Sequence, residues 1–143
     1  MEFKDAIVDF NKMYGLPCPD KPTLDAVGDI RGRILKFTKT LRDELNEGED
    51  LIYKMNQNPD LDSSAILTEL ADWYGDIIVY AASEMAKFGL PLDETLNIIM
   101  QSNMSKKNPD GTVTYNEDGK VMKGSQYWKP EPRIRSMLET YMK

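Results

Sequence analysis

The sequence predicts an all-α protein: an antiparallel bundle of four main helices with a small hairpin or ordered loop near the C-terminus. Apolar residues recur three or four positions apart through most of the chain, which is the spacing of one helix face. Glycine and proline interrupt this pattern where helices are expected to end. The chain has 143 residues, 41% of them hydrophobic, so we expect one domain over residues 1–143.

The first two helices are expected over residues 3–14 and residues 23–56. Gly15 and Pro17 end the first helix, because neither residue favours its continuation. In the second, the apolar residues keep helical spacing over several turns. Pro59 then breaks the pattern.

The third helix is expected to start at a cap formed by Asp62 or Ser63 and to end near Phe88, before Gly89. It is apolar almost all round, which is typical of a central helix.

The fourth helix is expected from Pro91 to about Met104, because proline is favoured in a first helical turn. Residues 112–122 place β-forming residues around an Asp-Gly pair, which predicts the hairpin or ordered loop. A short last helix is expected over residues 133–142.

Charge and composition exclude several classes of function. The net charge of −6 disfavours binding to a nucleic-acid polymer. The absence of histidine excludes imidazole bases, Ser-His triads and His-ligated zinc. Cys18 is the single cysteine, so no internal disulfide forms, and no apolar run is long enough to cross a membrane. The N-terminus does not resemble a signal peptide, and we therefore expect a cytoplasmic protein.

Acidic residues at one-turn spacing occur on both long helices. The second helix carries Glu44 and Glu47, and the third carries Glu69 and Asp72, with Asp76 one turn further. Residues three or four apart share a helix face, so each pair presents its carboxylates in one direction. Acids that converge on a partly buried space repel one another unless a cation neutralises them, and Mg²⁺ prefers such oxygen ligands.

A helical projection of the second helix gives these acids a direction. The centre of the apolar stripe is expected at Leu41, Leu45 and Ile52. Glu44 then lies at the edge of the stripe and Glu47 just beyond it. Asp43 and Asp50 point nearly opposite, and we expect both to be solvated bystanders.

The order Asp43-Glu44-x-x-Glu47, followed by Glu69-x-x-Asp72, resembles the acidic motif of the all-alpha NTP pyrophosphohydrolases. That superfamily includes the MazG-like proteins, the dimeric dUTPases, the dCTP pyrophosphatases and the phosphoribosyl-ATP pyrophosphohydrolases. Its usual pattern begins with two glutamates, and Asp43 stands here in place of the first.

A second stretch resembles a phosphoribosyl-ATP pyrophosphohydrolase-like subgroup that is often found in bacteria and phages. The matching residues are Ser102-Asn103-Met104-Ser105-Lys106, Pro109-Asp110-Gly111, Asp118-Gly119-Lys120-Val121-Met122-Lys123-Gly124 and Tyr127. The resemblance runs from about Leu41 to Pro132, which is most of the chain.

The resemblance implies an enzyme that hydrolyses a nucleoside triphosphate, (d)NTP, to (d)NMP and pyrophosphate, with nucleotide-pool housecleaning as its role. It implies that Glu44, Glu47, Glu69 and Asp72 hold Mg²⁺, with Mn²⁺ as a substitute, and carry catalysis. It also implies a homodimer or a dimer of dimers. We expect no membrane partner.

Four further residues are candidates for binding substrate. Asn103 and Lys106 lie one turn apart and are expected to grip phosphate or sugar oxygens. Lys123 and Tyr127 are expected to close over the substrate from the following loop. Structural roles remain open for them: a helix cap for Asn103, a favourable helix-dipole position for Lys106 and a packing anchor for Tyr127.

Three other functions remain open. A non-catalytic helical interaction or regulatory bundle would need no metal site. A calcium-binding module over residues 108–119 is disfavoured, because the segment fails the EF-hand template. A phosphohydrolase of another type would release orthophosphate instead of pyrophosphate.

Overall fold

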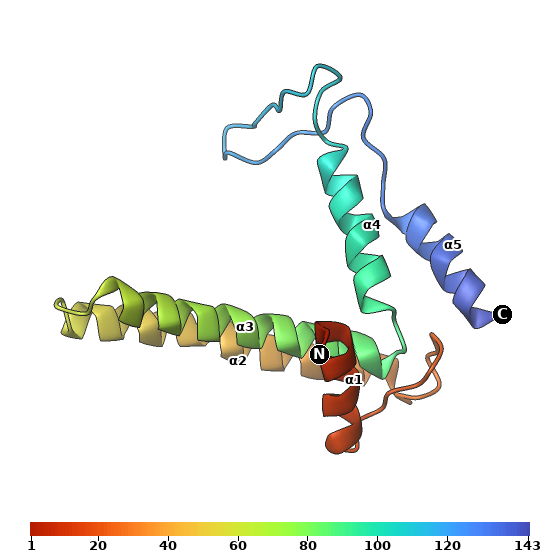
Figure 1. Ribbon diagram of the computed structural model, residues 1–143, viewed down its shortest axis with the longest axis horizontal. Coiled ribbons are helices and arrows are strands. Elements are labelled where there is room, and N and C mark those ends of the chain that lie inside the picture. The colour runs from red at the N-terminus through yellow and green to blue at the C-terminus, as the bar shows by residue number, and fades with distance from the viewer. The chain divides into compact units, whose positions relative to one another are not determined.

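The computed structural model describes all 143 residues and consists of helices, loops and one short hairpin (Figure 1). The helices are α1 Phe3–Met13, α2 Ile30–Gln57, α3 Ser63–Lys87, α4 Leu92–Met104 and α5 Glu131–Met142. The all-α prediction is confirmed. The chain divides into two compact units, Met1–Gly89 and Leu90–Lys143, and each is described by itself. That the whole chain forms one domain stays a prediction.

Two helices start at residues other than those predicted. The second was expected from residue 23, but α2 begins at Ile30, because Gly28 adopts a φ of 70° and Asp29 caps the helix. The Asp29 carboxylate accepts a hydrogen bond from the Gly32 amide at 3.1 Å. The last helix begins two residues earlier than expected, since Pro132 is tolerated in a first turn.

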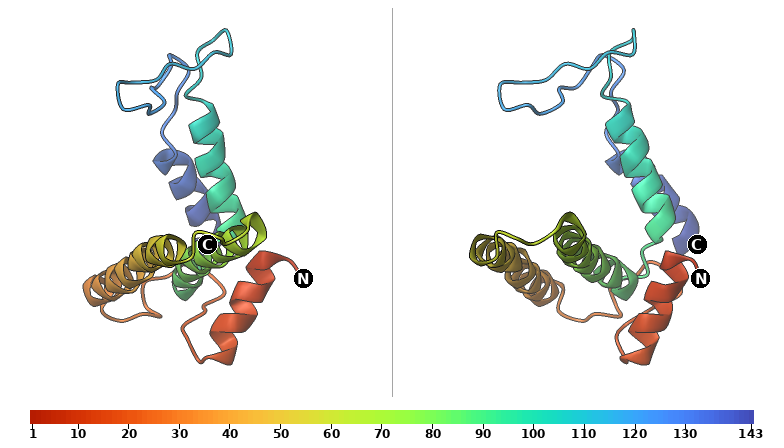
Figure 2. Two further views of the ribbon diagram at one scale, coloured as in Figure 1. Left: turned by 90° about the vertical axis from the view of Figure 1, so that its left-hand side faces the viewer. Right: turned by 60° about the vertical axis from the view of Figure 1, so that its left-hand side comes forward.

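Unit 1 is built on a hairpin of two long helices, with α2 and α3 side by side (Figures 1 and 2). Asp62 caps α3, as the sequence predicted, by accepting from the Ala65 amide at 2.8 Å. α1 packs against α3 through the fully buried Asn11. Its amide donates to the Ser83 carbonyl at 3.0 Å, and the Ser83 hydroxyl donates back to Asn11 Oδ1 at 2.6 Å.

The stripe of α2 that faces α3 is not the one that the helical projection predicts. Leu45 and Ile52 were expected at its centre, yet they are 49% and 60% exposed. Glu44 is buried instead, and Gly48 lies against Trp73 of α3. The projection was wrong because α2 carries apolar residues on more than one face, and periodicity alone does not select the face that packs on α3.

Unit 2 contains α4, α5 and the ordered loop between them. An isolated antiparallel bridge joins Tyr115 to Val121, and the Asn116 amide donates to the Lys120 carbonyl at 2.8 Å. Gly119 takes a φ of 77° at the turn. The prediction of a small hairpin or ordered loop is confirmed. None of the helices has the length and apolar character needed to span a membrane.

Candidate functional site

A close contact between α2 and α3 fixes the place where the acidic residues lie. The Trp73 indole nitrogen donates to the Glu44 carbonyl at 2.8 Å. A Cβ atom on Gly48 would lie 2.6 Å from Trp73 Cζ2, so a side chain there would force the indole ring or the helices to shift. Glycine at this position therefore allows the two helices to approach closely beside the motif acids.

Glu44 is a buried carboxyl without a compensating partner. It is only 6% exposed, and its Oε1 atom has no hydrogen-bond partner. Burial raises the pKa of Glu44 above its ordinary value, and a hydrogen bond and charge repulsion from Glu47 raise it further. The negative charges of Asp76 and Asp72 act in the same direction. A buried group surrounded by like charges is costly, and a cationic ligand would relieve that cost.

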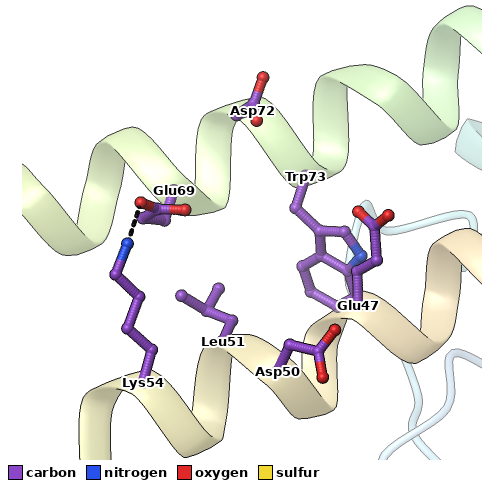
Figure 3. Close-up of a pocket in the computed structure, with 7 residues that line it drawn as sticks. All are labelled: Glu47, Asp50, Leu51, Lys54, Glu69, Asp72 and Trp73. Carbon is purple, nitrogen blue, oxygen red and sulfur yellow. Dashed lines mark hydrogen bonds and ion pairs between the residues drawn. The ribbon is translucent and has the colours of Figure 1, made fainter.

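An acidic pocket of about 220 Å³ opens on the same seam (Figure 3). Its lining residues are Glu47, Asp50, Leu51 and Lys54 from α2, and Glu69, Asp72 and Trp73 from α3. Lys54 is the single cation among four carboxylates in this lining. Its Nζ forms an ion pair with Glu69 Oε1 at 2.5 Å, so the other three carboxylates have no cation beside them in the pocket. The remaining negative charge makes the pocket suitable for metal cations, or for phosphates that arrive together with them.

The structure brings the predicted acids into one neighbourhood but not into a finished metal site. Glu47, Glu69 and Asp72 line the acidic pocket, and Glu44 is buried close enough for Glu47 and Asp72 to influence its pKa. No group of three or more acids lies close enough together to hold one ion. The side chains would therefore have to turn toward one another to bind a metal.

The two expected bystanders differ from each other. Asp43 is exposed and pairs with Lys39 at 2.9 Å, as expected for a solvated residue. Asp50 is exposed, as expected, but it lines the acidic pocket instead of pointing away from the motif acids (Figure 3). It lies one turn from both Glu47 and Lys54, so it shares the face that they occupy.

Sequence reasoning missed Lys54. Lys54 follows Glu47 by seven residues, and residues two turns apart share a helix face. That spacing could have predicted that Lys54 lies on the same face as Glu47. Its partner Glu69 lies on the other helix, however, and that pairing depends on how the two helices meet.

In unit 2, backbone contacts draw three of the four candidate substrate residues toward the end of α4. The Gly124 amide donates to the Lys106 carbonyl at 2.8 Å, and the Tyr127 amide donates to the Gly124 carbonyl at 3.2 Å. The Lys123 ammonium lies 5.0 Å from the centre of the Tyr127 ring. Asn103 is exposed one turn before Lys106. Substrate binding by these residues stays a prediction.

A second anchor in unit 2 involves Trp128. The buried Ser102 hydroxyl donates to the Trp128 carbonyl at 2.8 Å, and the Trp128 amide donates to Ser105 Oγ at 3.2 Å. The Arg133 guanidinium stacks on the indole ring at 3.5 Å from its centre. These contacts hold the chain before α5 against the end of α4.

No protein-family model and no curated protein sequence matches this chain. Among solved structures, the chain is similar to a crystal structure of a "putative NTP pyrophosphohydrolase" from Exiguobacterium sp. 255-15. The TM-score is 0.50 and the identity 22%, over 99% of this chain and 96% of that chain. At this identity the likeness concerns the fold alone.

Proposed function

We propose that this protein is a metal-dependent nucleoside triphosphate pyrophosphohydrolase that converts (d)NTP and water to (d)NMP and pyrophosphate. The observation that carries the proposal is the buried Glu44 carboxyl, whose Oε1 has no hydrogen-bond partner, among other acids and next to an acidic pocket. The name of the similar structure agrees with this activity.

The donor set suits Mg²⁺, with Mn²⁺ as a substitute. Glu44, Glu47, Glu69 and Asp72 would hold the metal through carboxylate oxygens, which hard cations prefer. When bound, the metal supplies charge neutralisation for the phosphate oxygens. The fit is supported by Oε1 of Glu44, a buried carboxylate oxygen that no donor within the chain satisfies.

Residues of the chain are candidates for the other roles in the reaction. Water attacks the α-phosphorus, the bond from that phosphorus to the bridging oxygen breaks, and pyrophosphate leaves. A motif glutamate or Asp76 takes the proton of the water. Lys54 is already in the acidic pocket and can contact phosphate oxygens as a cation. In unit 2, Asn103, Lys106, Lys123 and Tyr127 are the further candidates for substrate contacts.

The test is a screen of dNTPs, NTPs and modified nucleotides with Mg²⁺ or Mn²⁺, scored for pyrophosphate. We expect pyrophosphate and the nucleoside monophosphate in equal amounts from at least one substrate. Release of orthophosphate instead would assign the chain to another class of phosphohydrolase. A preference for modified nucleotides would support a role in nucleotide-pool housecleaning.

We also propose a homodimer or a dimer of dimers. Large apolar residues remain exposed on both helices of the hairpin, among them Ile34, Leu45, Ile52, Leu67, Tyr74 and Ile78. Exposed apolar surface of this kind is typical of an interface. A stable monomer in light scattering at micromolar concentration would contradict this proposal.

The same surface favours one alternative, a non-catalytic helical interaction or regulatory bundle. Such a protein would bind a partner through α2 and α3 and need no cation at Glu44. The nucleotide screen and a Mg²⁺ titration of thermal stability distinguish the two functions. A non-catalytic bundle would release no pyrophosphate, and its melting temperature would not change with Mg²⁺.

A further inference from the structure

A second cavity, larger than the acidic pocket, lies between α1, α2 and α3. Its volume is about 590 Å³, within the range of pockets that enclose small molecules. Aromatic walls come from Phe10 of α1, Tyr14 directly after α1, Phe37 of α2 and Tyr80 of α3. Aromatic walls suit contact with a flat ring.

One end of this cavity is a half-enclosed group of charges. Glu84 Oε1 accepts from Arg33 Nε at 2.5 Å, and Glu84 Oε2 accepts from Arg33 Nη2 and from Lys87 Nζ, both at 3.0 Å. The side chains of Arg33, Glu84 and Lys87 are 19%, 13% and 11% exposed. Two cations share one anion, so this end has a net positive charge in a protein of net charge −6.

The unused hydrogen-bonding capacity of this group consists of donors. Both oxygens of Glu84 already accept hydrogen bonds. A guanidinium carries five N–H donors and an ammonium three, and Glu84 uses two from Arg33 and one from Lys87. Lys36 adds a further cation to the lining. This surplus of donors favours a ligand that presents acceptors at this end.

The cavity and the acidic pocket lie along one helical seam. Asp76 lines the cavity, and its charge also acts on the buried Glu44. On α2, Thr40 of the cavity and Glu47 of the acidic pocket are seven residues apart, or about 10 Å along the axis. An elongated ligand can thus have a ring in the cavity and anionic groups near the acidic pocket.

We propose that this cavity binds the base of the nucleotide and selects bases with a carbonyl at C4 of a pyrimidine or C6 of a purine, such as uracil or hypoxanthine. The identification of the ligand as a nucleotide rests on the proposed function. The carbonyl oxygen accepts from Arg33 and Lys87, and the ring lies between the aromatic walls. Cytosine and adenine carry an amino group at the corresponding position, which sets donor against donor and leaves buried polar groups unpaired.

The experiment measures nucleoside binding without phosphates, by calorimetry in buffer with a metal chelator. Uridine is compared with cytidine, and inosine with adenosine. We expect uridine to bind at least about tenfold more tightly than cytidine, and inosine than adenosine, because an unmatched polar contact is strongly disfavoured. Lys87→Met should reduce this ratio to within about threefold, since it removes a donor.

Lys36→Gln is the second variant, because Lys36 is exposed and its replacement does not disturb the charge group around Glu84. Lys36→Gln should weaken binding of uridine and inosine while the protein stays folded. Lys39→Gln is the matched control: Lys39 is an exposed lysine on the same helix that pairs with Asp43 and lies outside the cavity. It should leave the ratio unchanged.

Equal affinity within each pair, or no nucleoside binding, would overturn the proposal. The latter is also the result if a second copy of the chain fills the cavity. Pyrophosphate release with no base preference would reject this cavity as the base site but keep the proposed function. Carbonyl-selective nucleoside binding without pyrophosphate release from any triphosphate would keep the cavity and reject the function.

Discussion

Two regions of the α2–α3 seam enclose charge in opposite ways. At one, Glu84 is held between Arg33 and Lys87, and every carboxylate oxygen has a donor. At the other, Glu44 is buried with one oxygen unpartnered, and the charges nearest to it are also negative. In the first region the chain itself neutralises the buried charge, whereas the second region needs a cation from outside the chain.

The difference separates a group that stabilises the fold from one that is kept for a ligand. Removing an acid from a balanced group leaves buried cations unpaired, which is destabilising. Removing an acid from an unbalanced group relieves repulsion, and its cost appears only as weaker binding of the ligand. Matched substitutions in the two regions should therefore have opposite effects on stability.

The largest expected effect comes from Glu84→Gln. It should lower the free energy of unfolding by about 3 kcal/mol, because Arg33 and Lys87 lose their shared anion. Glu44→Gln, in metal-free buffer, should leave the free energy unchanged or raise it. Urea denaturation of both variants measures the contrast, and equal destabilisation would remove the distinction between the two regions.

The next effect is on catalysis at the acidic pocket. Glu47→Gln and Glu69→Gln keep the size of the side chain but remove a charge, and each should slow pyrophosphate release by about 10²-fold or more. Asp43→Asn is the control, since Asp43 is exposed on the same helix and should be silent. Steady-state rates suffice, and full activity in Glu69→Gln would refute the assignment of these roles.

The response to metal comes third. Mg²⁺ at a hundred times its dissociation constant should stabilise the folded protein by about 2.7 kcal/mol, because it binds the folded state and not the unfolded chain. Glu44→Gln should reduce this gain. Thermal melting with and without Mg²⁺ measures it, with CaCl₂ as a test of ion selectivity. A melting temperature that ignores Mg²⁺ even with a nucleotide present would contradict the metal site.

The smallest expected effect is a pH dependence of stability in metal-free buffer. The folded state raises the pKa of Glu44 above its ordinary value of 4.5, mainly through burial. Glu44 therefore contributes stability below pH 4.5 that is lost as the pH rises through the higher, folded-state pKa. Melting curves from pH 4.5 upward should show this decline, and Glu44→Gln should flatten it. An unchanged slope in that variant would assign the decline to other groups.

Local sequence signals determined most of the helix boundaries and the identity of the acids. Asp62, Gly89 and Pro91 begin or end helices by chemistry that involves only their near neighbours, so the predicted boundaries there agree with the structure. The one-turn spacing of Glu44 with Glu47, and of Glu69 with Asp72, likewise needs no tertiary information.

Only the tertiary structure decided which faces meet. Periodicity shows which residues share a face, but α2 has apolar residues on several faces, and the contact of Gly48 with Trp73 selects one of them. That choice buries Glu44, exposes Leu45 and brings Asp50 to the acidic pocket. The pairing of Arg33 with Glu84 joins residues 51 positions apart, and no local rule connects them. Partners on different helices depend on how the chain packs, so they could not be read from spacing alone.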